Sequence, residues 1–288
     1  MKVKKIYIEL SDICGLNCDF CPSKKSLRGV MSVEKFATLA SKICKNAEIF
    51  TFHILGDPLK LLNLSEYLEL AKAYEMKLEL TTSGFYLNQK NINLLLNYKN
   101  IKQINLSLMS FLSQKKLSLD EYFKPILTLC NKHLEKENES FINLRLWNLD
   151  TNSNPPKENF QIYEFLKNTF CVNFEPNSLK TRLARHILLN QKSLFKWPNL
   201  NQKALYKNGK CHALKEQLGI LSDGTLVPCC LDTKGDINLG NVFKTEPEIL
   251  FNSKEFQSLK QALKEGKRTQ KLCQTCEFFK TRLKSSLL

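Results

Sequence analysis

Short apolar segments alternate with longer amphipathic ones from the start of the chain to Trp197. The short segments are rich in Ile, Leu, Phe and Tyr, a composition typical of β-strands. This pattern predicts six strands, at Lys5–Leu10, Ile49–Ile54, Leu78–Thr82, Ile104–Leu108, Phe141–Trp147 and Val172–Phe174.

The longer segments carry apolar residues at the spacing of an α-helix. In one of them Leu64, Leu68 and Ala71 recur on one face, with charged residues between them. The same pattern predicts helices at Ser32–Cys44, Ser65–Tyr74, Asn88–Leu96, Leu119–Leu134 and Phe160–Lys167. Repeated strand–helix units favour a parallel sheet covered by helices. Six units predict an α/β fold, a partial (β/α)6 barrel, because a complete eight-unit barrel takes about 250 residues.

The pattern changes after Trp197. Two short apolar runs on either side of Asp223-Gly224 predict a β-hairpin, and Ser253–Lys264 reads as an amphipathic helix. We therefore expect two domains, a barrel at 1–204 and a small α+β domain at 205–288 with a hairpin and a helix.

Eleven cysteines are a high count for a chain of 288 residues. The sequence shows no signal peptide and no run of about 18 apolar residues, so we expect a cytoplasmic protein without a membrane segment. Thiols stay reduced in the cytosol, and clustered reduced cysteines are suited to binding soft metals.

The formal net charge is +15, from 43 Lys and Arg against 28 Asp and Glu. Such an excess can attract nucleic acid or another anionic partner. The basic residues are scattered, and no RNA-binding signature accompanies them. A lysine-rich solvated surface is the favoured interpretation, and an RNA partner is the alternative.

Three cysteines stand close together directly after the first predicted strand, as Cys14-x-x-x-Cys18-x-x-Cys21. A structural zinc site is closed by four ligands. No fourth cysteine or histidine is near in the sequence, and the next histidine is His53. A [4Fe–4S] cube held by three thiolates would keep one iron open to a substrate or cofactor.

This spacing, with Phe20 before the last cysteine, resembles the signature of the radical S-adenosylmethionine (radical SAM) superfamily. The resemblance implies that the open iron binds the amino and carboxylate groups of SAM. It also implies that reduction cleaves SAM to a 5′-deoxyadenosyl radical, which removes a hydrogen atom from the substrate. The electron would come from a flavodoxin- or ferredoxin-like reductant, and the partial barrel would be of the radical SAM type.

One tripeptide and two serines further along the chain resemble the SAM site of that superfamily. Gly56-Asp57-Pro58 resembles its Gly-Glu-Pro motif, with an Asp whose side chain is one methylene shorter. Ser83 and Ser107 follow or end the third and fourth strands, where the resemblance implies contacts to SAM polar groups. These positions lie at the carboxyl ends of strands, the edge where parallel α/β folds bind ligands.

Arg145 lies among apolar residues of the fifth predicted strand. A buried cation needs a partner, and the SAM carboxylate and a structural ion pair are the two alternatives. His53 follows the second strand and faces either the site or the core.

A second set of thiols occupies the last third of the chain, at Cys211, Cys229, Cys273 and Cys276. Four cysteines suit structural zinc or a fully ligated [4Fe–4S] cluster. Their arrangement resembles a shortened, twitch-type SPASM domain of radical SAM enzymes, which implies one auxiliary [4Fe–4S] cluster. Cys230 competes with Cys229 as the ligand, and we expect Cys229.

An auxiliary cluster that accepts an electron would make the net reaction an oxidation. We therefore expect a radical SAM oxidoreductase or maturase that oxidises or rearranges a small polar or peptidyl substrate. His186, Arg182 and Arg185 are weak catalytic candidates, as a base and as anion-binding groups. The alternatives are a radical SAM enzyme that modifies RNA and a non-enzymatic zinc protein.

Overall fold

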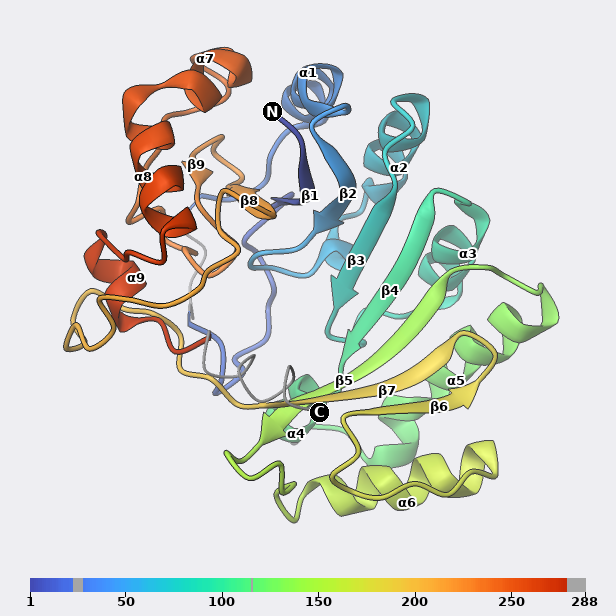
Figure 1. The fold of residues 1–288 in the computed structure, drawn as a ribbon. Helices are drawn as coiled ribbons and strands as arrows, with labels where there is room; N and C mark the ends of the chain where they lie inside the picture. Colours follow the sequence, from blue (N-terminus) through green and yellow to red (C-terminus); the bar gives the residue numbers. More distant parts are fainter. Residues whose placement is uncertain (23–27, 115, 279–288) are drawn as a thin grey trace.

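One twisted sheet organises the chain (Figure 1). The computed structural model describes residues 1–22, 28–114 and 116–278. Within these ranges nine strands form the sheet, in the order β6-β7-β5-β4-β3-β2-β1-β8-β9. The strands are β1 Val3–Ile8, β2 Ala47–Phe52, β3 Leu78–Thr82, β4 Ile101–Ser107, β5 Phe141–Leu149, β6 Lys180–Ala184, β7 Ile187–Ser193, β8 Gln217–Ile220 and β9 Leu226–Val227.

Helices cover the outer face of the parallel strands (Figure 1). The five predicted helices correspond to α1 Val33–Ile43, α2 Leu64–Ala73, α3 Gln89–Asn97, α5 Leu119–Glu135 and α6 Asn159–Phe170. Shorter elements not predicted from the sequence are η1 Pro58–Lys60, α4 Met109–Gln114, α7 Pro247–Asn252 and α9 Lys271–Thr275. The mixed α/β fold with a parallel sheet is therefore confirmed.

The first five predicted strands are confirmed, and the sixth is wrong. Val172–Phe174 has no strand structure, because α6 ends at Cys171 in the left-handed conformation and Pro176, two residues beyond the run, lacks a donor. Both apolar side chains instead pack against the core from a loop. The sixth parallel position belongs to β7, which pairs with β5, while β6 pairs with β7 in the antiparallel sense.

The two faces of the strands differ in polarity. On β1, Ile6 and Ile8 are buried in the core, while Lys5 and Tyr7 occupy the other face. Parallel sheets buried by helices on both sides have nearly continuous apolar strands. The alternation seen here therefore means that helices cover one face and that polar residues line the interior of the partial barrel.

The C-terminal segment continues the same sheet. β8 pairs with β1 in parallel and forms the predicted hairpin with β9. The predicted amphipathic helix is α8 Lys254–Lys264, which buries Phe256, Leu259 and Leu263. The division into 1–204 and 205–288 stays a prediction.

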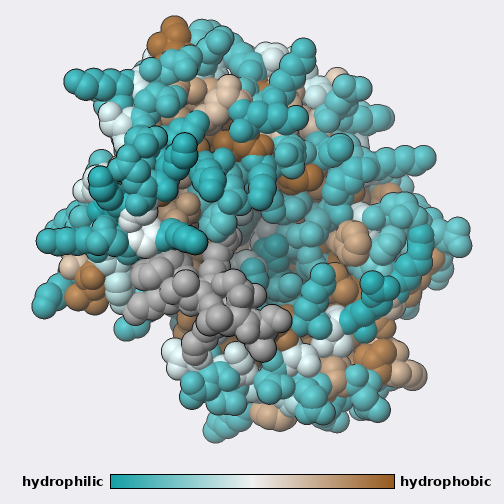
Figure 2. Space-filling view, viewed as in Figure 1, coloured by the Kyte–Doolittle hydropathy of each residue, from teal (hydrophilic) through white to brown (hydrophobic). Residues whose placement is uncertain are grey.

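The visible face of the molecule is largely hydrophilic, with small separate hydrophobic patches (Figure 2). In the described part of the chain, no helix combines the length and the apolar character needed to cross a bilayer.

Candidate active site

The loop that carries the first three cysteines is tied to β1 at both of its ends. Met31 donates its N–H to the carbonyl of Leu10 at 2.9 Å, and Ser11 forms a bridge with Val30. The Arg28 guanidinium makes two hydrogen bonds to the buried Glu9 carboxylate, at 2.8 and 2.9 Å. The ends of the loop are therefore fixed at the carboxyl edge of the sheet.

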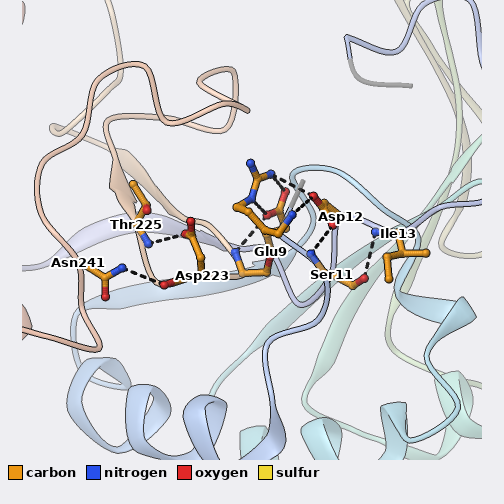
Figure 3. A network of polar contacts seen from close by, with 10 residues as sticks. Glu9, Ser11, Asp12, Ile13, Asp223, Thr225 and Asn241 are labelled. Atoms are coloured by element: carbon orange, nitrogen blue, oxygen red, sulfur yellow. Dashed lines mark hydrogen bonds and ion pairs between the residues drawn. The ribbon is translucent and has the colours of Figure 1, made fainter. Parts of the chain in front are cut away.

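Asp12 reinforces this anchor from its own side of the loop. Its carboxylate accepts the N–H groups of Arg28 and Gly29, both at 2.9 Å. Glu9 also accepts the N–H of Ser222 at 3.1 Å, which joins the loop to the C-terminal segment. Figure 3 shows Glu9 and Asp12 in one polar network that continues toward Asp223.

The loop brings Cys14, Cys18 and Cys21 together. Burial raises the pKa of the Cys14 thiol to about 11, and the nearby Asp57, Cys18 and Cys21 add to this rise. The Cys14 carbonyl accepts a hydrogen bond from the Tyr86 hydroxyl. A cation bound to the Cys14 sulfur would favour the thiolate form that its surroundings disfavour.

The three thiols do not converge on one point. Across the described ranges, no group of three or more Cys, His, Asp or Glu side chains has the geometry to hold a single metal ion. A [4Fe–4S] cube binds each thiolate at a different iron and does not need such convergence. The residues present therefore fit a cube held by three cysteines.

Gly56 packs directly against the backbone at the start of the cysteine loop. It has φ +70°, and a Cβ at this position would lie 2.1 Å from the carbonyl oxygen of Ser11. A side chain is excluded here because it would push the backbone that leads into Cys14. Pro58 follows as the buried first residue of η1.

The Asp57 carboxylate is bound by its own chain. One oxygen accepts the N–H of Leu59 at 3.1 Å, and the other accepts the Thr82 hydroxyl at 3.0 Å. The same oxygen accepts the N–H and hydroxyl of Ser83, at 2.8 and 2.6 Å. Burial raises the Asp57 pKa, while these four donors lower it. Asp57 and Ser83 thus fix the ends of two strands relative to each other.

Arg145 and His53 lie near each other inside the barrel. Arg145 pairs in register with Ser107 and stacks over Trp147, with 4.8 Å from Cζ to the ring centroid. No Asp or Glu of the described residues lies within ion-pair distance of its guanidinium. Burial lowers the Arg145 pKa to about 10.

His53 is neutral in this surrounding. Burial and the nearby Arg145 charge lower the His53 pKa to about 4. Its Nδ1 atom is buried without a hydrogen-bond partner among the described residues. Arg145 and His53 are therefore available to a polar ligand in the interior.

The second cysteine set lines one cavity of about 50 Å3. All four predicted residues contribute to its wall: Cys211, Cys229, Cys273 and Cys276. Burial raises the pKa of Cys229 well above its usual range, and the neighbouring thiols raise it further. These four thiols are the donor set of a fully ligated [4Fe–4S] cluster, which binds each thiolate at a different iron.

Cys230 points away from this cavity. Its thiol is hydrogen-bonded to the Tyr7 hydroxyl on the inner face of β1, and Arg145 is near Tyr7. Cys229 lies in a bend just after β9, and Cys230 lies in the turn that follows it. Consecutive cysteines are thus divided between the cavity and the barrel interior.

The three catalytic candidates lie elsewhere. His186 has φ +59° in the turn before β7, and its ring lies 4.7 Å from that of Phe141, the first residue of β5. Arg185 pairs with Glu139, and Arg182 is exposed on β6. The structure therefore places His186 and Arg185 at the amino edge of the sheet, opposite the cysteine loop, because β7 begins after this turn.

Sequence reasoning missed the residues that support the two sites. Glu9 and Arg28 are 19 positions apart, and Arg268 lines the second cavity. The signal for Glu9 was a carboxylate inside an apolar strand, which needs a buried partner. No local pattern marks Arg268.

Comparisons with known proteins agree with this arrangement. The Radical SAM superfamily matches residues 8–142, and the SPASM iron–sulfur cluster-binding domain matches residues 211–277. No curated protein matches the chain.

Solved structures share the fold at low identity. BtrN in complex with AdoMet and 2-DOIA is 17% identical with a TM-score of 0.61, over 96% of this chain and 94% of that chain. Native anSMEcpe with bound AdoMet is 16% identical with a TM-score of 0.61, over 94% and 89% of the two chains. Streptococcus suis SuiB bound to S-adenosylmethionine is 14% identical with a TM-score of 0.54, over 97% and 72%.

These two domains imply a SAM-binding [4Fe–4S] cluster, SAM itself and an auxiliary iron–sulfur cluster. The two cysteine sets lie within the matched ranges, the first in 8–142 and the second in 211–277. This chain is a member of the radical SAM superfamily that carries a SPASM domain.

Proposed function

We propose that the chain is an enzyme that cleaves SAM reductively and oxidises or rearranges a small polar or peptidyl substrate. The observation that carries the proposal is the group of three thiols at the carboxyl edge of a parallel sheet with a polar interior. When bound there, a [4Fe–4S] cluster supplies the electron that breaks SAM, after a flavodoxin- or ferredoxin-like protein has reduced it.

Residues around the first cluster position SAM in this proposal. Cys14, Cys18 and Cys21 hold the cluster, and the Gly56–Pro58 turn offers backbone groups to the SAM ammonium. Ser107 lies beside Arg145 in register on the inner face. Arg145 binds the SAM carboxylate, because a guanidinium can grip a carboxylate with two hydrogen bonds. Ser83 acts through Asp57, whose carboxylate accepts a hydrogen bond from the Ser83 hydroxyl.

The auxiliary cluster makes an oxidation feasible. Cys211, Cys229, Cys273 and Cys276 would hold it in the C-terminal domain, which we place at 205–288, after the radical SAM core at 1–204. A cluster ligated at all four irons has no open site, so electron transfer suits it better than substrate binding. Cys230 and Tyr7 lie between this cavity and the barrel interior.

The substrate class follows the fold neighbours. BtrN binds 2-DOIA, anSMEcpe binds the Cp18Cys peptide and SuiB binds the precursor peptide SuiA. These ligands are a small molecule and two peptides, and they support the same range of substrates for this chain.

Anaerobic reconstitution with iron and sulfide tests the proposal. We expect roughly eight iron atoms per chain, four for each [4Fe–4S] cluster, and 5′-deoxyadenosine formation with a strong reductant. Cys18→Ala should abolish SAM cleavage. Cys44→Ala is the matched control, because Cys44 caps α1 away from both thiol sets, and it should cleave SAM normally. Two zinc ions without iron, or cleavage by the Cys18 variant, would contradict the proposal.

A further inference from the structure

Arg268 is a buried cation in the wall of the auxiliary cavity. Its residue is 3% exposed, and it lines the cavity with the four cysteines. The backbone of Arg268 is held by the neighbouring chain, since its N–H donates to the Lys207 carbonyl at 2.8 Å. Its own carbonyl accepts the Gln274 side chain at 2.7 Å. The position of this charge is therefore fixed by the fold.

The guanidinium binds the segment that carries two of the thiols. Its Nη1 donates to the carbonyl of Cys273 at 3.2 Å and to that of Cys276 at 3.0 Å. These carbonyls lie in and directly after α9, where a helix leaves its last acceptors without intrahelical donors. The Arg268 side chain thus joins the two ends of the Cys-x-x-Cys segment and places a positive charge beside it.

Other charged or titratable groups also face this cavity. Asp232 is buried there, and its two oxygens accept the N–H groups of Asp236 and Ile237, both at 2.8 Å. His212 lies 2.7 Å from Glu216, and Lys210 belongs to the same wall. Asp232 carries the opposite charge to Arg268. Because Asp232 is the same in every variant of Arg268, a difference in potential between these variants reports on position 268.

We propose that Arg268 is the positioning residue that makes the auxiliary cluster the better electron acceptor. A [4Fe–4S] cluster with four thiolates is an anion, and its reduction adds one more negative charge. A buried cation beside two of the ligands stabilises the reduced form more than the oxidised form, because charges interact strongly where water is excluded. The inference rests on the proposed function, in which this cluster takes one electron from a substrate radical.

The test is a redox titration of the auxiliary cluster alone. A background with Cys14, Cys18 and Cys21 replaced by Ala holds only the second cluster, whose one-electron reduction by dithionite is followed by electron paramagnetic resonance. Arg268→Gln keeps an amide donor for the carbonyls and removes the charge. We expect it to disfavour reduction about tenfold or more, which is a fall of about 59 mV or more in midpoint potential.

Two further variants separate charge from structure. Lys267→Gln removes the neighbouring positive charge, which is exposed and paired with Glu265 at 2.8 Å, and should leave the potential unchanged because solvent screens it. Arg268→Lys retains the charge and should stay near the wild-type potential. If Arg268→Gln does not retain the cluster, the Lys variant decides, and a fall of its potential by about 59 mV would overturn the inference.

Failure of the inference and failure of the proposed function give different results. A cluster present in every variant with the same potential overturns only the role of Arg268. A background protein that binds no iron removes the auxiliary cluster, so the role of Arg268 falls together with the proposed electron transfer to that cluster. Reductive cleavage of SAM is judged separately, by 5′-deoxyadenosine formation in the protein with all of its cysteines.

Discussion

Arg28 and Glu9 form the buried ion pair that closes the cysteine loop. The substitution Arg28→Met tests how much this pair contributes to the free energy of unfolding. The side chains are 7% and 0% exposed, and two hydrogen bonds of 2.8 and 2.9 Å join them. Met retains most of the aliphatic volume but removes the charge. The Glu9 carboxylate would then be buried with the Ser222 N–H, at 3.1 Å, as its remaining hydrogen-bond donor among the described residues.

The expected cost is large because one charge of the pair remains. Breaking a buried pair from one side typically destabilises by about 3–5 kcal/mol. The charge of Arg28 also lies 3.9 Å from Asp12, whose carboxylate holds the same end of the loop. We therefore expect Arg28→Met to lose about 3–5 kcal/mol of unfolding free energy and to reduce the iron content of the first site.

Urea unfolding of the iron-free protein measures this cost without the contribution of bound metal. The chain offers a matched control in Arg185→Met, because Arg185 pairs with Glu139 while the side chains are 47% and 77% exposed. Surface pairs are worth about 0–1 kcal/mol. Equal losses in the two variants would refute the reasoning. A second check is Glu9→Gln in the Arg28→Met protein, which should recover part of the loss because the Glu9 charge is no longer buried without its partner.

The remaining predictions concern single positions in the two sites. Gly56→Ala places a Cβ 2.1 Å from the Ser11 carbonyl oxygen, so iron analysis should show loss of the first cluster, roughly four iron atoms per chain. Arg145→Gln should weaken SAM binding about tenfold to a hundredfold in calorimetry, because a charged hydrogen bond is lost, and decarboxylated SAM should bind both proteins equally. Cys229→Ser should lose roughly four iron atoms while Cys230→Ser keeps all of them, and the reverse pattern would show that the ligand is Cys230.

Local periodicity was enough to predict most of the barrel. Each of the first five strands has apolar residues on one face and is followed by an amphipathic helix. The strand pattern and the helix pattern therefore predict the same strand–helix unit. Val172 and Phe174 gave the same local signal, but they satisfy it by packing against the core from a loop. Distinguishing a short buried loop from a short strand needs the hydrogen-bond partners, which the sequence of three residues does not contain.

The ligand sets could be predicted because cysteine spacing is a local property with few competing explanations. The residues that hold these ligands in place could not be predicted. Arg28 reaches Glu9 across 19 positions, and Ser222 reaches the same carboxylate across 213. Such contacts are set by the order of strands in the sheet. From the sequence alone, an isolated Arg is compatible with many exposed positions as well as with a buried ion pair.

The strand order also gives a physical reason for the tandem of Cys229 and Cys230. β8 pairs with β1, and Gly219 of β8 lies opposite both Tyr7 and Val227. A Cβ on Gly219 would lie 2.8 Å from the Val227 side chain and 3.5 Å from the Cys229 carbonyl oxygen, so this glycine lets the hairpin close against the barrel wall. Cys229 then lies on the cavity side, and Cys230 lies beside Tyr7 on the interior side. In the proposed function, an electron that leaves a substrate in the interior would pass these two adjacent residues on its way to the auxiliary cluster.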